Sequence, residues 1–155
     1  MGDNSYPSME DRKKDLGFWI KQLDNGMEQQ CNRRMAPLDI TASQMEVLTF
    51  LHMHEDKEIH QIDVERHLHC SNPTITGIVQ RLEAKGYVER IADQKDKRFK
   101  QLKLTEKSTQ AFSKMDQNRR ESERILWEGF SEDERTQLLG YLQRIYQNLL
   151  SEEGE

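Results

Sequence analysis

Apolar residues recur at three- and four-residue steps along most of the chain, which is typical of amphipathic helices. The first run covers residues 9–35 and is expected to end before Pro37. The second run begins after Thr41, which has capping-box spacing with Gln44, and it ends near His54. The first third of the chain is therefore predicted to consist of two helices.

A helix-turn-helix motif is predicted next. A minor strand over residues 58–60 leads into a short helix over residues 61–68. His69 follows at the turn, where Gly is commoner because the backbone there often adopts a positive φ. Cys70 occupies an apolar position in this turn and is expected to belong to the core.

The stretch over residues 70–98 carries the clearest pattern. Ser71 is a candidate N-cap, and Pro73 falls in the first turn of the helix that follows. Four apolar residues at helical spacing predict a buried stripe: Ile75, Ile78, Val79 and Leu82. The other face is polar and nearly free of acidic side chains, as expected of a helix in a DNA groove: Asn72, Thr74, Thr76, Gly77, Gln80 and Arg81. Gly86 after Lys85 is expected to end this helix.

A β-hairpin, or wing, is predicted after the helix. Strand-like alternation indicates an outgoing strand over residues 87–92, a tip over 93–97 and a returning strand over 98–104. The returning strand alternates poorly, so an irregular pairing is expected there.

Two long helices are predicted to complete the chain. Thr105 is expected to cap the first, whose middle is too polar to be buried in a monomer. Ser131 and Glu134 have capping-box spacing before the last helix, whose apolar stripe continues to Leu149. Because only 34% of residues are apolar and 33% are charged, the monomer's core is thin. Shared burial in an oligomer is therefore expected.

Charge is distributed unevenly along the chain, whose net charge is −5. Residues 72–108 contain nine Lys and Arg against five Asp and Glu, which gives +4. The remaining residues contain 14 bases against 23 acids, which gives −9. This asymmetry places the basic segment on the predicted helix and wing, where it favours contact with nucleic acid.

Several classes of protein are excluded by what the sequence lacks. No signal-peptide run and no stretch near the roughly 20 apolar residues of a membrane span is present, so a cytoplasmic protein without membrane contact is expected. The two cysteines form no CxxC pair, which suits a reducing compartment. An enzyme is not expected, because Gly-rich phosphate loops and the GxSxG and HExxH motifs are absent.

The ordered motifs resemble the MarR family of bacterial winged helix-turn-helix regulators over about residues 16–149. Three strings carry the resemblance: RLEAKGYVER at the end of the helix-turn-helix, DQKDKR in the wing, and LKLTEKS before the next helix. Asp96 and Arg98 have the family's D-x-R arrangement. Ser108 stands where many members have Gly, which is a departure without an evident functional meaning.

The resemblance implies a mainly α fold with a small β-wing, in which a winged helix-turn-helix lobe is joined to long N- and C-terminal dimerisation helices. The expected division is a disordered arm (1–8), a dimerisation helix (9–35), a winged helix-turn-helix DNA-binding domain (36–104), C-terminal dimerisation helices (105–150) and a tail (151–155).

It also implies a DNA-binding transcriptional repressor that binds a pseudo-palindromic operator as a homodimer and is released by a small aromatic or phenolic effector, with no cofactor. By analogy with the family, Arg98 enters the minor groove and Asp96 orients it. Residues expected to contact double-stranded DNA are Ser71, Asn72, Thr74, Thr76, Gly77, Gln80, Arg81, Lys95, Asp96, Lys97, Arg98 and Lys100.

Other sensing modes stay open at this point. All five histidines lie within residues 52–69, near Cys70, which raises a metal site, although pairs two residues apart on a helix point away from each other. Cys31 lies beside Arg33 and Arg34, which would lower its pKa in a thiol-based oxidant sensor.

An effector cleft and a different kind of partner are the remaining alternatives. Four side chains are candidates to line an effector cleft, although each is as readily explained as core: Trp19, Met35, Met45 and His52. A protein-interaction module without DNA binding is a more distant alternative, and it leaves the wing without a role.

Overall fold

The computed structural model describes residues 8–92 and 100–152. The chain divides into two compact units, Met1–Asn118 and Arg119–Glu155, and the boundary falls inside one helix. Elements follow in the order α1 (Met9–Arg12), α2 (Leu16–Met35), the 3-10 turn η1 (Ala36–Leu38), α3 (Ala42–Met53), α4 (Gln61–Leu68), α5 (Asn72–Ala84), β1 (Val88–Ala92), β2 (Lys100–Leu104), α6 (Glu106–Leu126) and α7 (Glu132–Glu152). The mainly α fold with a small wing is confirmed.

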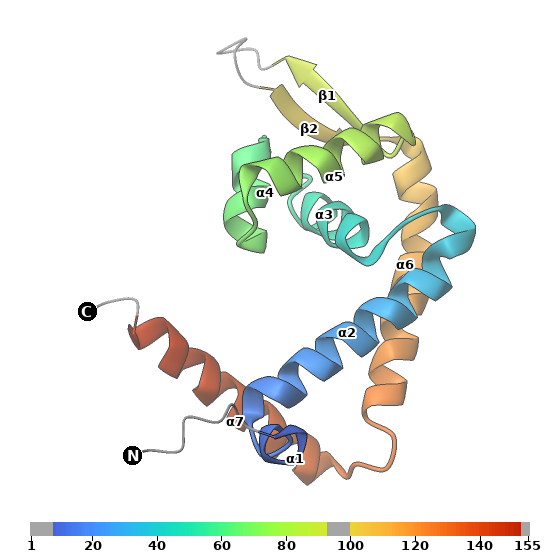
Figure 1. The fold of residues 1–155 in the computed structure, drawn as a ribbon. Helices are drawn as coiled ribbons and strands as arrows, with labels where there is room; N and C mark the ends of the chain where they lie inside the picture. Colours follow the sequence, from blue (N-terminus) through green and yellow to red (C-terminus); the bar gives the residue numbers. More distant parts are fainter. Residues whose placement is uncertain (1–7, 93–99, 153–155) are drawn as a thin grey trace. The chain divides into compact units, whose positions relative to one another are not determined.

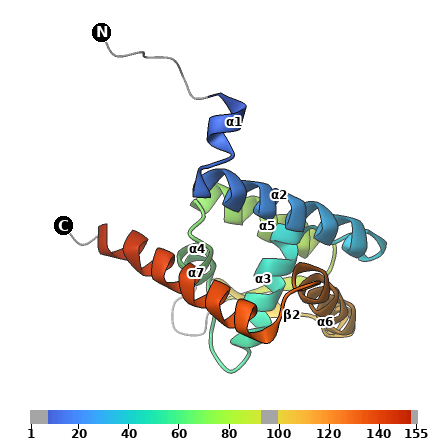
Figure 2. The same ribbon diagram turned by 90° about the horizontal axis from the view of Figure 1, so that it is seen from below.

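The first unit contains a lobe of three short helices and the wing (Figures 1 and 2). Helix α5 packs on both α3 and α4, and the β1–β2 hairpin follows α5. The core of the lobe is apolar, and its fully buried side chains come from every one of these elements. Among them are Val47 and Leu48 of α3, Val64 of α4 and Leu82 of α5.

The N-terminal helix is broken, contrary to the single helix expected over residues 9–35. Helix α1 ends at Arg12, and α2 begins only at Leu16, after Asp15 in an extended conformation. The segment before Leu16 has no apolar stripe to bury, and Met9 itself is 59% exposed, so packing does not hold one continuous helix there. Ser8, expected in the arm, instead caps α1 by accepting a hydrogen bond from the Asp11 N–H.

The helix boundaries that depend on caps and turns match the expectations closely. Thr41 and Gln44 form the predicted capping box of α3. Helix α4 spans the predicted residues, and His69 after it adopts a φ of 50°. Residues 58–60 form only an isolated bridge between His60 and Gln101 rather than a strand, because a single residue pairs with β2.

The wing pairs more regularly than expected. Five residue pairs run in antiparallel register from Val88 with Leu104 to Ala92 with Lys100, without a bulge. Tyr87 lies before β1 rather than within it, because its carbonyl accepts hydrogen bonds from the Thr105 N–H and the Ser108 hydroxyl. The predicted tip and the start of the returning strand lie outside the described residues.

The two C-terminal helices differ from the predictions at their ends. The Thr105 hydroxyl donates to the carbonyl of Gly86 at 2.7 Å instead of capping α6. Ser131 and Glu134 form the predicted capping box. Helix α7 continues to Glu152, so the first residues of the expected tail are helical. Within the described ranges, no helix is both long and apolar enough to cross a lipid bilayer.

Candidate nucleic-acid interface

Helix α5 is held by one buried stripe and two defined ends. Its four predicted apolar residues are all buried in the lobe. At its C-terminus the N–H groups of Gly86 and Tyr87 donate to the carbonyls of Glu83 and Leu82, which is the Schellman pattern, and Gly86 supplies the positive φ of 77°. The helix therefore presents its opposite face at a fixed rotation.

The described members of the predicted DNA-binding set lie on α5, at its start and at the start of β2. Ser71, Asn72, Thr74, Gln80 and Arg81 are exposed on α5 or at its start. Thr76 and Gly77 are half-buried on the same helix, and Lys100 is exposed at the start of β2. Four predicted wing residues lie outside the described residues: Lys95, Asp96, Lys97 and Arg98.

Ser71 has the backbone conformation of an N-cap but does not cap with its side chain. Its hydroxyl lies 3.0 Å from the hydroxyl of Thr74, and no hydrogen bond joins it to the backbone of the first turn. The first N–H groups of α5 are therefore not bonded by this side chain, which suits contact with a phosphate at the helix N-terminus.

Two of the predicted residues are joined to α4 by hydrogen bonds. Asn72 donates to a carboxylate oxygen of Glu65 at 2.7 Å, and Gln61 donates to the hydroxyl of Thr76 at 2.7 Å. Gln61 also donates to the same Glu65 oxygen at 3.0 Å. Glu65 is only 9% exposed. We call Gln61, Glu65, Asn72 and Thr76 the α4–α5 polar network, whose two α4 members were not among the predicted contacts.

Arg81 lies flat along its own helix. Its guanidinium is 3.7 Å from the position that a Cβ on Gly77 would occupy. The lack of a side chain at Gly77 thus leaves room for the arginine over the surface of α5. This geometry holds the positive charge of Arg81 over the exposed side of α5 at Gly77.

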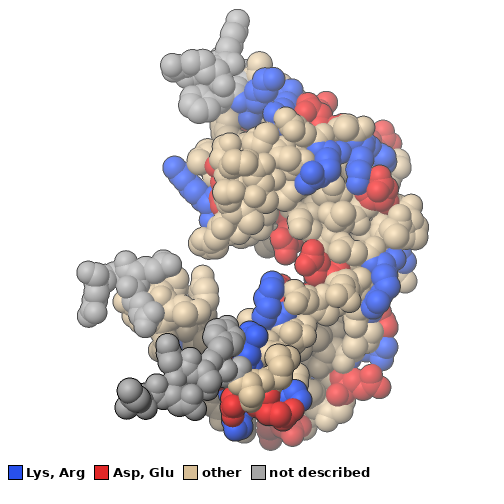
Figure 3. All heavy atoms as spheres, viewed as in Figure 1, with Lys and Arg blue, Asp and Glu red and all other residues tan. Residues whose placement is uncertain are grey.

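The charges around this face are mixed, with basic residues near the wing (Figure 3). Lys100 and Lys103 are exposed on β2. Arg90 of β1 is paired with Glu83 of α5 at 3.2 Å, so this arginine joins the wing to the helix and is not available as an unpaired cation. Lys100 therefore contributes more directly to the positive potential than Arg90.

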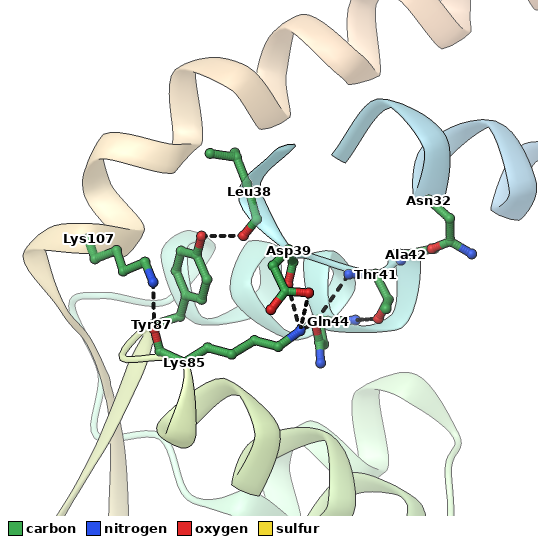
Figure 4. A network of polar contacts seen from close by, with 9 residues as sticks. All are labelled: Asn32, Leu38, Asp39, Thr41, Ala42, Gln44, Lys85, Tyr87 and Lys107. Carbon is green, nitrogen blue, oxygen red and sulfur yellow. Dashed lines mark hydrogen bonds and ion pairs between the residues drawn. The ribbon is translucent and has the colours of Figure 1, made fainter. Parts of the chain in front are cut away.

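A second polar cluster fixes the C-terminal end of α5 (Figure 4). The Lys85 ammonium donates to the carbonyl of Asp39 at 2.6 Å and to the side-chain oxygen of Gln44 at 3.1 Å. The Tyr87 hydroxyl donates to the carbonyl of Leu38 at 2.6 Å. Lys107 of α6 donates to the Lys85 carbonyl at 2.6 Å. These bonds connect α5 to the turn between α2 and α3 and to α6.

The two cysteines differ in burial, and Cys70 is not where it was expected. Cys70 is exposed, because it lies in the turn after the left-handed residue His69, so its assignment to the core is wrong. Cys31 is buried, and burial raises its pKa; a hydrogen bond from Asn118 and the charge of Arg34 lower it less. The expected lowering by neighbouring arginines is therefore wrong, and a raised pKa does not favour an oxidant-sensing thiol.

The histidines make separate contacts with neighbouring side chains and carbonyls. His52 is 2.6 Å from a Glu55 carboxylate oxygen and stacks on Phe112, while His54 bonds to the Phe50 carbonyl at 2.8 Å. In the part of the chain that the structure describes, no three His, Cys, Asp or Glu side chains gather closely enough to hold a metal ion.

The four residues proposed to line an effector cleft differ in their solvent exposure. Met35 is fully buried, and Met45 packs against the same core. Trp19 is 51% exposed on α2, and its ring N–H donates to the Lys13 carbonyl at 2.8 Å. A shallow pocket does lie beside α3 and β2, but its lining includes none of these four residues.

A family model described as "MarR family" matches residues 38–98. The chain is 27% identical over 143 residues to the HTH-type transcriptional repressor IacR of Pseudomonas putida, which covers 92% of this chain and 84% of that protein.

Two solved structures are similar over most of the chain. The transcription regulator MarR from Oenococcus oeni PSU-1 is 29% identical with a TM-score of 0.66, covering 86% of this chain and 99% of that one. The S. aureus MepR–DNA complex has a TM-score of 0.79 at 23% identity and covers 88% and 98% of the two chains. The second similarity concerns the fold.

Proposed function

We propose that this chain, which belongs to the MarR family of winged helix-turn-helix regulators, represses transcription as a homodimer on a pseudo-palindromic operator. Its membership makes it a DNA-binding transcriptional regulator and not an enzyme. The observation that carries the rest is the face of α5: Gln80 and Arg81 are exposed above a fully buried apolar stripe. The similarity to the repressor IacR supports repression as the mode of action.

The proposed contacts divide into base-reading and positioning groups. Gln80, Arg81 and Thr76 face base edges or the adjacent phosphates of a major groove, because they lie on the exposed side of α5. Asn72 and Thr74 contact the backbone near the helix N-terminus. Lys100 and the predicted wing residues add phosphate and minor-groove contacts, which makes affinity depend strongly on salt.

The dimer is proposed from apolar surface that each unit leaves exposed. On α2, apolar side chains at helical spacing are about half exposed: Leu16, Trp19, Ile20, Leu23 and Met27. On α7 a second stripe is exposed to a similar degree: Leu138, Leu139, Leu142, Tyr146 and Leu149. Contiguous apolar stripes of this kind mark interaction sites, and a second copy of the chain is the partner that the family implies.

Introducing a charged side chain into the apolar stripe of α7 tests whether this stripe forms the dimer interface. Leu142→Glu is expected to convert the dimer to a monomer in sedimentation experiments, because a carboxylate would be buried in the apolar interface. Gln143→Glu adds the same charge at the next exposed position, outside the stripe, and is expected to leave the dimer intact. A monomeric wild-type protein at micromolar concentration would contradict the proposal.

Release by a small aromatic or phenolic anion completes the proposal and follows from the family resemblance. The test is a gel shift on DNA from the protein's own promoter region, under reducing conditions with a chelator present. Aromatic acids, zinc and peroxide are then added in turn. Release by aromatic acids alone supports the proposal, whereas release by zinc or peroxide alone would replace it with a metal or redox signal.

Two variants test the DNA contacts in that assay. Arg98→Ala is expected to weaken binding to all sites, and Gln80→Ala is expected to change the sequence preference. Arg33→Ala removes the same kind of charge from an exposed position on α2 and serves as the control. If both test variants bound like the wild type, the assigned contacts would be wrong even though the protein binds DNA.

A further inference from the structure

We infer that the α4–α5 polar network makes Thr76 a hydrogen-bond acceptor toward DNA, so that it selects adenine or cytosine on the strand that it faces. The inference rests on the proposed placement of α5 in a major groove. It adds to that proposal the chemical group that one side chain recognises, and it assigns Gln61 and Glu65 as positioning residues.

Glu65 orients the network, because its carboxylate can only accept hydrogen bonds. One of its oxygens lies 3.0 Å from Gln61 Nε2 and 2.7 Å from Asn72 Nδ2. Reversing either amide would place a carbonyl oxygen against the carboxylate, which is repulsive. Glu65 therefore determines which way both amide groups face, and its burial removes water that would otherwise compete for these bonds.

The orientation of the two amides then determines the polarity of Thr76. The Gln61 nitrogen donates to the Thr76 hydroxyl at 2.7 Å and occupies one of its lone pairs. The Thr76 hydroxyl in turn donates to the Asn72 side-chain oxygen at 3.4 Å. With its proton directed into the protein, the hydroxyl offers solvent one lone pair and its methyl group offers an apolar contact.

Such an acceptor distinguishes bases by their exocyclic groups. In the major groove adenine N6 and cytosine N4 carry amino groups, whereas guanine O6 and thymine O4 are acceptors. An acceptor-only Thr76 bonds the amino groups and meets repulsion at the carbonyl oxygens. A threonine whose hydroxyl rotates freely would accept either kind of base, so the preference arises from α4.

The test removes the Thr76 hydroxyl and the amino group of the base, first separately and then together. The operator position that depends on Thr76 is first found by selecting randomised duplexes with wild-type protein and with Thr76→Val, which keeps the shape and removes the hydroxyl. At that position adenine is then replaced by purine, or cytosine by a pyrimidinone without the amino group. Dissociation constants are measured for each combination of protein and duplex.

Removing the amino group is expected to weaken wild-type binding about five- to tenfold, the size of one net hydrogen bond, and to have no further effect on Thr76→Val. In Glu65→Gln the preference for adenine or cytosine over guanine or thymine at this position is expected to shrink, since both amides can then reverse and the Thr76 hydroxyl can donate as well as accept. If Glu65→Gln is unstable, Gln61→Met provides a second variant: it removes the donor to the Thr76 hydroxyl but leaves Asn72 bonded to Glu65, so the same preference is expected to weaken in part. Thr49→Val is the control, because this exposed threonine lies on α3, outside both the proposed DNA contacts and the network.

Two results would overturn the inference. One is a Thr76-dependent position occupied by guanine or thymine, which would show that the hydroxyl donates. The other is an equal loss in wild type and Thr76→Val when the amino group is removed. Absence of DNA binding by every variant and the wild type would instead count against the proposed function, so the two failures are distinguishable.

Discussion

Replacing Lys85 by Met tests how the C-terminal end of α5 is held. The side chain is 23% exposed and joins α5 to the turn before α3 through the Asp39 carbonyl and Gln44. Methionine keeps most of the aliphatic stem and removes the ammonium. The variant therefore isolates the polar contacts from the packing.

The size of the effect follows from the partners that are left behind. Hydrogen bonds to charged groups contribute about 1.5–3 kcal/mol each where the acceptor is left unsatisfied. Asp39 is exposed, so its carbonyl can bind water in the variant, and the Gln44 oxygen still accepts from the Thr41 N–H at 3.1 Å. Because both acceptors keep another partner, we expect a loss of about 2 kcal/mol in the free energy of unfolding, below the summed range of about 3–6 kcal/mol.

The ion pair between Lys85 and the Asp39 carboxylate is expected to matter much less. Its N–O distance is 3.2 Å, but the Asp39 side chain is 81% exposed, and pairs of that kind contribute about 0–1 kcal/mol. Asp39→Asn removes the charge and keeps a residue that tolerates the φ of 51° at this position. We expect it to lower the free energy of unfolding by less than about 0.5 kcal/mol.

Urea denaturation at one fixed protein concentration compares these variants. A loss of about 2 kcal/mol corresponds to a fall in the midpoint of about 1 M for a slope near 2 kcal/mol/M. Lys21→Met, which removes an exposed pair with Asp24 at 2.9 Å, is the control and is expected to leave the midpoint unchanged. Equal losses for Lys85→Met and Asp39→Asn would refute the reasoning, because the ion pair would then be the dominant contact.

Two further predictions concern titrating groups. Labelling the native protein with a thiol reagent near neutral pH should modify exposed Cys70 quickly and buried Cys31 slowly. Because the pKa of Cys31 is raised in the folded state, its contribution to stability is present at low pH and is lost as the pH rises through the ordinary thiol range. Cys31→Ala should therefore flatten this part of the curve of unfolding free energy against pH. An unchanged curve would contradict the prediction. Ser131→Ala is expected to lower the free energy of unfolding by about 1 kcal/mol through loss of the α7 cap. The bonds from Ser131 lower the pKa of Glu134, so the cap's contribution should decline as the pH falls through the carboxyl range, and helicity measured against pH in both proteins checks the direction.

The elements that short-range rules determine were predicted well. Caps and turns depend on a few neighbouring residues, which is why the capping boxes at Thr41 and Ser131 and the left-handed His69 are confirmed. The stripe of α5 follows from spacing alone and is buried as predicted. The break before Leu16 was missed because a helical pattern does not report whether anything covers the helix.

The parts that depend on distant contacts could not be predicted. Asn118 lies in a very polar run, yet it is 3% exposed and contacts the sulfur of Cys31 at 3.6 Å. Nothing local distinguishes it from its exposed neighbours. Gln61 and Glu65 were missed for the same reason, since their role appears only when α4 lies against α5. Polar residues one turn apart on the helix before a recognition helix would be the signal to examine.

Hydroxyl-radical footprinting of the protein's own promoter DNA tests the central claim most directly. A homodimer that inserts one α5 into each of two successive major grooves should protect two symmetric half-sites whose centres lie roughly 34 Å apart along the duplex. The protection should disappear as the salt concentration is raised. Protection of a single half-site would contradict the proposed dimer, and the absence of salt-sensitive protection would contradict DNA recognition by this face of α5.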